Sequence, residues 1–208
     1  MSSHARRLVT TLAVSSLLVL TACSGNGGEG SSPSATTSGG ASGSGSPMSS
    51  MSTVETYSGH GISFRYPKAW KELTMSGTTA SSGKQLWNET VGMDGINFVT
   101  VSGYTINIPI TAGNIDEQKD IIGQQIATLF ERAGGGLERG PTDETLAGLP
   151  ALGFTGTALN PSGEEVSSRL VLAFDRLTEY FVNCQYDSSG EDEILEGCDQ
   201  IVSTFSID

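Results

Sequence analysis

The stretch Gly61–Trp70, GISFRYPKAW, decides how the folded part of this chain begins. Its apolar residues stand at alternate positions, the pattern of a half-buried β-strand: Ile62, Phe64 and Tyr66. Pro67 has a fixed φ and no backbone N–H, so it ends the ladder of hydrogen bonds and keeps the preceding residue extended. We therefore predict a first strand that ends at Pro67, and a turn that returns Trp70 to the sheet.

Upstream of this stretch, residues 1–22 have the features of an export signal. Two arginines precede an apolar run that is too short and too interrupted by serine to span a membrane. The segment ends in LTAC, Leu20 to Cys23, the pattern of a bacterial lipobox, so we expect Cys23 to carry acyl chains such as palmitate. Two acyl chains are enough to hold a protein stably on a bilayer. The prediction is a lipoprotein on the outer face of the cell membrane. An ordinary signal with a chance cysteine is the alternative, and both the general and the twin-arginine export routes stay open.

Residues 23–54 follow the signal and are nearly all Gly, Ser, Thr, Ala and Pro. Such a composition buries too little apolar surface to offset the entropy lost on folding, so we predict a flexible tether that begins at the lipidated cysteine. From residue 55 to residue 208 aromatic and aliphatic residues recur, and this length is enough for one hydrophobic core. The chain therefore divides into signal, tether and a single globular domain.

Charge limits the partners of this domain. The whole chain of 208 residues has a net charge of −12, and loss of Arg6 and Arg7 with the signal leaves nine basic side chains against 23 acidic ones, about −14. Nucleic acids and anionic lipid headgroups would be repelled, so nucleic-acid binding is excluded. The acidic surface is interpreted as a source of solubility, with binding of cations or basic partners as the alternative.

Periodicity predicts alternating strands and two amphipathic helices within residues 55–208. The expected strands are 62–66, 71–75, 85–91, 95–108, 137–147, 152–158, 166–174 and 180–186, the last three forming a meander with turns at 160–163 and 175–178. A first helix should begin at Asn114, capped by Asn114 and Glu117, and a last helix should be capped by Ser189. Cys184 and Cys198 both face inward in this arrangement. As an even pair in an exported protein, they are predicted to form a disulfide that joins the last helix to the last strand.

A resemblance follows from the order of these elements and from the opening motif ISF-x-YP-x-x-W at residues 62–70. Residues 57–207 resemble the PsbP-like superfamily, which takes in PsbP subunits, Mog proteins and actinobacterial lipoproteins of the LpqN type. The resemblance implies an α+β fold, an antiparallel sheet with helices packed on it as an α/β/α sandwich. It implies no catalytic residues, and fold likeness is a weak guide to function.

Catalytic chemistry finds little support in the residues. His60 is the sole histidine of the mature chain, and between two glycines it is interpreted as a loop residue. Clustered His and Cys for zinc are absent from the sequence, and the acidic run near Asp187 lacks the spacing of a calcium loop. We predict no catalytic residues, no metal and no cofactor.

The function expected from the sequence is a non-enzymatic interaction or assembly module of the cell envelope that binds an envelope protein. A carrier or sensor of a small apolar ligand or lipid is the alternative, with Trp70 and Trp87 as candidate ligand-binding residues because indole favours half-wet positions. A hydrolase is the third class. It would require two facing carboxylates in a cleft.

Overall fold

The alternating stretch forms strand β2 (Ile62–Pro67) in the computed structural model, which describes residues 54–74 and 83–208. Its apolar side chains are at most 4% exposed, as their spacing predicts: Ile62, Phe64 and Tyr66. The predicted signal, the lipidated Cys23 and the tether up to residue 53 lie outside the described residues. The predicted burial of one face of this strand is confirmed.

Strand β2 is the second strand, and the prediction that it is the first was wrong. Strand β1 (Val54–Gly59) precedes it and pairs with it antiparallel. The two strands are joined by His60 and Gly61, both of which have positive φ. The two-residue strand β9 (Ser206–Ile207) pairs with the other edge of β2. The result is a small sheet in the order β1-β2-β9 that joins the two ends of the domain.

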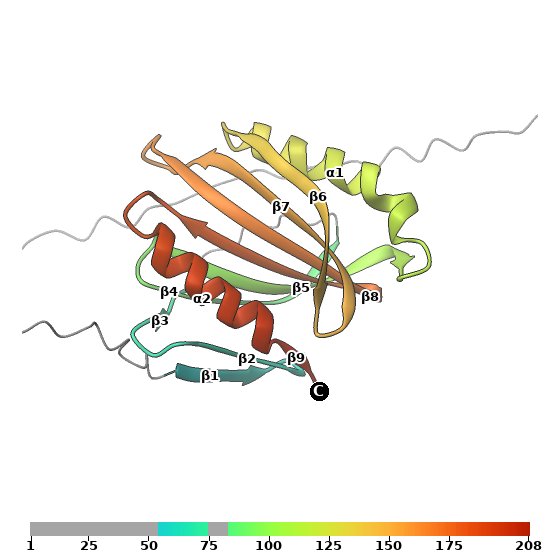
Figure 1. Cartoon of the computed structure of the whole chain (residues 1–208), viewed down its shortest axis with the longest axis horizontal. Helices are drawn as coiled ribbons and strands as arrows, with labels where there is room; N and C mark the ends of the chain where they lie inside the picture. Colours follow the sequence, from blue (N-terminus) through green and yellow to red (C-terminus); the bar gives the residue numbers. More distant parts are fainter. Residues whose placement is uncertain (1–53, 75–82) are drawn as a thin grey trace, which may run out of the picture.

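The remaining strands form a larger antiparallel sheet in the order β3-β4-β5-β8-β7-β6 (Figure 1). Its members are β3 (Lys71–Glu72), β4 (Lys84–Gly92), β5 (Phe98–Ile110), β6 (Gly136–Leu146), β7 (Leu149–Leu159) and β8 (Glu165–Tyr186). All five pairings between neighbours are antiparallel, as short connections favour. The predicted strands are confirmed with shifted ends, β3 being shorter and β5 beginning and ending later than expected.

Strand β8 folds back on itself. Its first half pairs with β7 as far as Ala173, and its second half pairs with β5 from Arg176 onward. A straight strand of its 22 residues would span about 70 Å, yet residues from both of its ends line one pocket. The reversal falls at the predicted turn, where Arg176 has a φ of 55° (Figure 1). The continuous strand is therefore in effect two strands of the predicted meander.

Helix α1 (Ile115–Arg132) packs on β6 and β7 through the predicted stripe. Asn114 precedes the helix, but the predicted capping by Asn114 and Glu117 was wrong, because no side chain caps the helix. The Asn114 amide instead accepts hydrogen bonds from the backbone N–H and the hydroxyl of Thr111, and donates to the carbonyl of Pro109. It thus stabilises the turn that leads into the helix.

Helix α2 (Glu191–Thr204) lies on the opposite side of the large sheet, against β8 and also against β2 of the small sheet. Gly190 is at its N-cap position, and the predicted cap by Ser189 was wrong, because the Ser189 hydroxyl donates to Asp187. Cys198 of this helix is bonded to Cys184 of β8, and neither is exposed. The predicted disulfide is confirmed.

Two hydrophobic clusters fill the layers on either side of the large sheet. One lies between α1 and the sheet, and the other lies between the sheet, α2 and the small sheet. The α+β fold with helices on both faces of an antiparallel sheet is therefore confirmed, with the small sheet added beside α2. Within the described part of the chain, no helix combines the length and hydropathy required to cross a bilayer.

Candidate functional site

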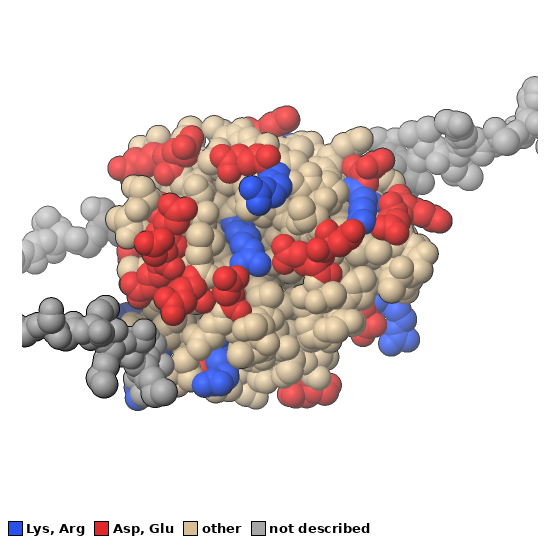
Figure 2. Space-filling model, viewed as in Figure 1, with Lys and Arg blue, Asp and Glu red and all other residues tan. Residues whose placement is uncertain are grey.

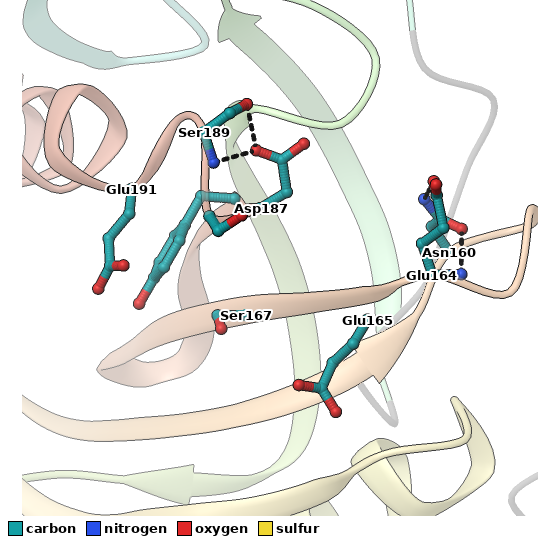
Figure 3. A pocket seen from close by; sticks show the side chains of 9 residues that line it. Asn160, Glu164, Glu165, Ser167, Asp187, Ser189 and Glu191 are labelled. Carbon is teal, nitrogen blue, oxygen red and sulfur yellow. Dashed lines mark hydrogen bonds between the residues drawn. The ribbon is translucent and has the colours of Figure 1, made fainter.

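A polar pocket of about 440 Å³ lies where the β7–β8 turn approaches the start of α2 (Figure 3). It is built from two segments far apart in the sequence, one around the start of β8 and one that runs from the end of β8 into α2. Nine residues line it: Asn160, Glu164, Glu165, Ser167, Tyr186, Asp187, Ser188, Ser189 and Glu191. Because β8 returns on itself, its two ends form adjacent walls of this pocket.

Four of the nine lining residues are carboxylates and none is basic: Glu164, Glu165, Asp187 and Glu191. Figure 2 shows acidic side chains gathered over the start of α2 on this face of the molecule. The nearby guanidinium of Arg169 binds Glu144 and Asp199, and it does not line the pocket. The electrostatic potential of the pocket is therefore negative, which favours a cationic ligand.

The turn on one side of the pocket is held by Asn160. Its Oδ1 atom accepts hydrogen bonds from the backbone N–H groups of Ser162 and Glu164, each at 2.9 Å. Its Nδ2 atom donates to the Glu164 carboxylate at 3.0 Å. Gly163 supplies the positive φ of 83° that the turn requires. One pocket carboxylate is thus fixed by its own turn.

Asp187 is fixed in the same way on the other side. Its Oδ1 atom accepts from the hydroxyl of Ser189 at 2.7 Å, from the Ser189 N–H at 2.9 Å and from the Gly190 N–H at 3.1 Å. These hydrogen bonds lower the pKa of the Asp187 carboxyl, the Ser189 hydroxyl contributing most. Asp187 therefore carries its negative charge throughout the neutral range.

Tyr186 and Ser167 contribute hydroxyl groups from neighbouring ends of β8. Burial raises the pKa of Tyr186, and the negative charges of Glu191 and Glu138 raise it further. The phenol therefore stays protonated. Glu165 and Glu191 extend from β8 and α2 on either side of Ser167 (Figure 3). The pocket offers hydroxyl groups between carboxylates, a set that can accept several hydrogen bonds from one ammonium or guanidinium group.

The α2 side of the pocket is attached to the loop between β4 and β5. Asn97 of this loop is 3% exposed, and its Oδ1 atom accepts a hydrogen bond from the Asp187 N–H at 3.0 Å. Asp94 accepts from the backbone N–H of Asn97 at 2.8 Å, and Gln185 donates to the carbonyl of Ile96 at 3.1 Å. These contacts join the β4–β5 loop to the end of β8 and to the segment between β8 and α2, behind the pocket.

Neither tryptophan that the sequence analysis singled out lines this pocket. Trp70 is 4% exposed, lies against Gly197 and donates to Glu193 at 3.3 Å, so it is a core residue with a satisfied indole N–H. Trp87 is half-buried and stacks on His60 with ring centroids 5.6 Å apart. A role in ligand binding stays a prediction for both tryptophans.

His60 lies at the β1–β2 turn, away from the pocket. Its Nε2 atom is 3.2 Å from the Glu89 carboxylate. Among residues 54–74 and 83–208, no three His, Cys, Asp or Glu side chains are grouped to hold a metal ion. The polar pocket is therefore the candidate functional site, because it brings four carboxylates together. Sequence reasoning noted its acidic run near Asp187 but treated the segment at 160–163 only as a turn.

The PsbP-like fold is established by comparison with solved structures. Cyanobacterial PsbP (CyanoP) from Synechocystis sp. PCC 6803 is 13% identical, with a TM-score of 0.55 over 79% of this chain and 98% of that chain. The domain therefore has the PsbP-like fold that the opening motif predicted. No protein-family model and no curated protein matches the sequence.

Two further structures are less similar. LpqN of Mycobacterium tuberculosis, described as involved in cell envelope biogenesis, is 14% identical with a TM-score of 0.46, over 74% of this chain and 89% of LpqN. A protein of Bacteroides thetaiotaomicron is 11% identical with a TM-score of 0.43, over 71% of this chain and 45% of that one. Both TM-scores are below 0.5, so the fold assignment rests on the cyanobacterial protein.

Proposed function

We propose that this protein is an envelope lipoprotein, anchored through Cys23 on the outer face of the cell membrane, whose domain is a non-enzymatic module that binds a basic segment of an envelope protein. The observation that carries the proposal is the polar pocket, in which four carboxylates face a volume of about 440 Å³ and no lining residue is basic. A lysine or arginine side chain entering this pocket would find several acceptors and a favourable potential.

The chemistry of the pocket favours this role over the alternatives. An apolar ligand would require a mostly apolar lining, whereas this lining is made of carboxylates, hydroxyls and one amide. The pocket does bring carboxylates together, but a hydrolase of the two-carboxylate kind needs one carboxyl kept protonated as a general acid, whereas hydrogen bonds lower the pKa of Asp187. A nucleophile activated by histidine would have to use His60, which contacts Glu89 and Trp87 outside the pocket. An interaction module needs neither an apolar cavity nor an activated nucleophile.

The pocket is tested with pentalysine as a probe and the full chain as the receptor. Replacing Glu164, Glu165 and Glu191 by Gln removes three negative charges with little change in shape. At about 0.2–1 kcal/mol for each exposed pair, affinity should fall roughly 3- to 150-fold at low salt. Added salt should weaken binding to the unaltered protein much more than binding to the variant.

A matched control removes the same charge elsewhere. Glu55, Glu117 and Glu131 are exposed and lie outside the pocket, so their replacement by Gln should lower affinity much less. Equal losses in the two triple variants would mean that net charge alone attracts the probe. The same pair of variants, used in affinity capture from the native membrane, should separate a partner that uses the pocket from one that does not.

The anchor is a separate part of the proposal, supported by the lipobox and the tether composition. Cys23→Ala should move the protein from the membrane fraction to the soluble exported fraction, because the acyl chains can no longer be attached. Mass spectrometry of the unaltered protein should find an acylated N-terminal cysteine. Retention of the Ala variant on the membrane would contradict a lipid anchor at this residue, while leaving the pocket proposal untouched.

A further inference from the structure

Tyr186 gives the polar pocket one aromatic wall. It ends β8, is half-buried, and packs against the hydrophobic cluster between the large sheet and α2 while it also lines the pocket. Among the described residues its ring stacks on no other aromatic ring, in contrast to Tyr57, which stacks on Phe64 with ring centroids 4.9 Å apart. The ring is therefore supported by the core on one side and open to a ligand on the pocket side.

Carboxylates border this aromatic wall. Burial and then the negative charge of Glu191 raise the pKa of Tyr186, so the Glu191 carboxylate lies near the phenol. Glu165 and Glu191 lie on either side of Ser167, and Asp187 follows Tyr186 directly in the chain (Figure 3). Acceptors from both segments that form the pocket therefore surround one ring.

The pocket carboxylates have no counter-ion of their own. In residues 54–74 and 83–208, the carboxylates that form ion pairs lie elsewhere: Glu89, Asp116, Asp143, Glu144, Asp175 and Asp199. None of the four carboxylates that line the pocket is among them. A cationic side chain that enters the pocket would thus form charge-assisted hydrogen bonds without displacing an existing ion pair.

Lysine and arginine would use these acceptors differently because their cations differ in shape. The lysine ammonium is a compact, strongly hydrated point charge that any group of carboxylates can bind. The arginine guanidinium is planar, has five donors around its edge and is weakly hydrated on its two faces, so it pairs best with a flat aromatic surface that has acceptors at its border. Tyr186 and its neighbouring carboxylates provide this combination.

We propose that the polar pocket selects arginine over lysine, and that the ring of Tyr186 determines this preference. The guanidinium lies on the pocket side of the ring, and its N–H groups donate to the carboxylates on both sides, Glu165 and Glu191. This inference rests on the proposed function, since it names the basic residue that the bound envelope segment would present to the pocket.

The test compares pentaarginine with pentalysine, two peptides of equal side-chain charge, by isothermal titration calorimetry on the full chain at low salt. The unaltered protein should bind pentaarginine about 3- to 10-fold more tightly, the size expected of one cation–π contact. Tyr186→Leu removes the ring and should reduce the preference to less than about 2-fold, mainly by weakening pentaarginine. Tyr186→Phe keeps the ring and should keep the preference.

A matched control changes a tyrosine outside the pocket. Tyr57 is half-buried and lies near Glu89, much as Tyr186 lies near Glu191, but it does not line the pocket. Tyr57→Leu should therefore leave the arginine preference unchanged, and loss of the preference in this variant would count against the pocket. A second readout needs no variant, because the δ-methylene protons of bound arginine should shift upfield in NMR spectra when they lie over the ring.

The proposal is overturned if the unaltered protein binds the two peptides equally, or if the preference survives in Tyr186→Leu. In both cases the proposed function stands, provided that the triple replacement of Glu164, Glu165 and Glu191 by Gln still weakens both peptides. If that triple variant binds the peptides as tightly as the unaltered protein does, the proposed function fails and this inference fails with it.

Discussion

Replacing Gly197 by Ala should destabilise the domain, although the same change stabilises most helices. Gly197 is buried in the middle of α2, where Trp70 from the segment after β2 lies across it. A methyl group at this position would overlap the six-membered part of the indole ring. The indole is itself confined by the core and by its hydrogen bond to Glu193, so it cannot move aside freely.

The expected size follows from two opposing contributions. Ala in place of Gly in a helix interior is favourable by about 1 kcal/mol. Overpacking a filled core costs about 1–3 kcal/mol, and overlap with a rigid ring belongs at the upper end of that range. The net loss for Gly197→Ala should therefore be about 1–2 kcal/mol. In a Trp70→Ala background the overlap disappears, so the same substitution should become favourable by about 1 kcal/mol.

Urea unfolding followed by far-ultraviolet circular dichroism measures all four members of this cycle without relying on tryptophan fluorescence. Trp70→Ala alone should cost about 3–5 kcal/mol, and the coupling between the two positions should be about 2–3 kcal/mol. A Gly197→Ala variant that is more stable than the unaltered protein would refute the reasoning. So would a substitution effect that is the same in both backgrounds.

Three further outcomes are expected. Replacing Cys184 and Cys198 together by Ala should lower the free energy of unfolding by about 3 kcal/mol, because the disulfide closes a loop with a sequence separation of 14; an unchanged urea midpoint would contradict this. Burial, and then a hydrogen bond with Glu89, raises the pKa of Tyr57 from 10.0 to about 12, so stability present below pH 10 should be lost as the pH rises toward 12. Tyr57→Phe should reduce that loss in melting curves recorded across this range. Burial opposes ionisation of Asp94, but hydrogen bonds from backbone N–H groups outweigh burial and lower its pKa below 3.8. The stability that the ionised Asp94 contributes should therefore be lost as the pH falls through the lowered pKa. Asp94→Asn should flatten the acid limb of a plot of the free energy of unfolding against pH.

Periodicity predicted the elements whose burial is one-sided. The helical stripe Ile122, Ile126 and Phe130 is buried against the sheet, and the apolar side chains of the alternating strand around Phe64 are buried as expected. Such patterns are legible because one face of each element contacts the core and the other contacts water. Strand β1 was missed because it has only two apolar side chains and lies at an edge, and β9 is too short to show any period.

Helix ends and the candidate site were harder to predict because they depend on contacts between distant segments. The hydroxyl of Ser189 could cap α2 or bind Asp187, and the sequence does not favour one hydrogen bond over the other. The pocket joins Glu165 to Asp187, which are brought together only by the return of β8 and its register with β7 and β5. The disulfide was predictable for a different reason, since an even pair of cysteines in a chain predicted to be exported has few other uses.

The attachment of the Asp187 segment to the β4–β5 loop has a consequence for the kinetics of binding. Both flanks of the polar pocket are already held by hydrogen bonds, one through Asn160 and the other through Asn97, so a ligand does not have to order them. Association should then be a single step whose observed rate rises linearly with probe concentration and falls with ionic strength, with no slower rearrangement behind it.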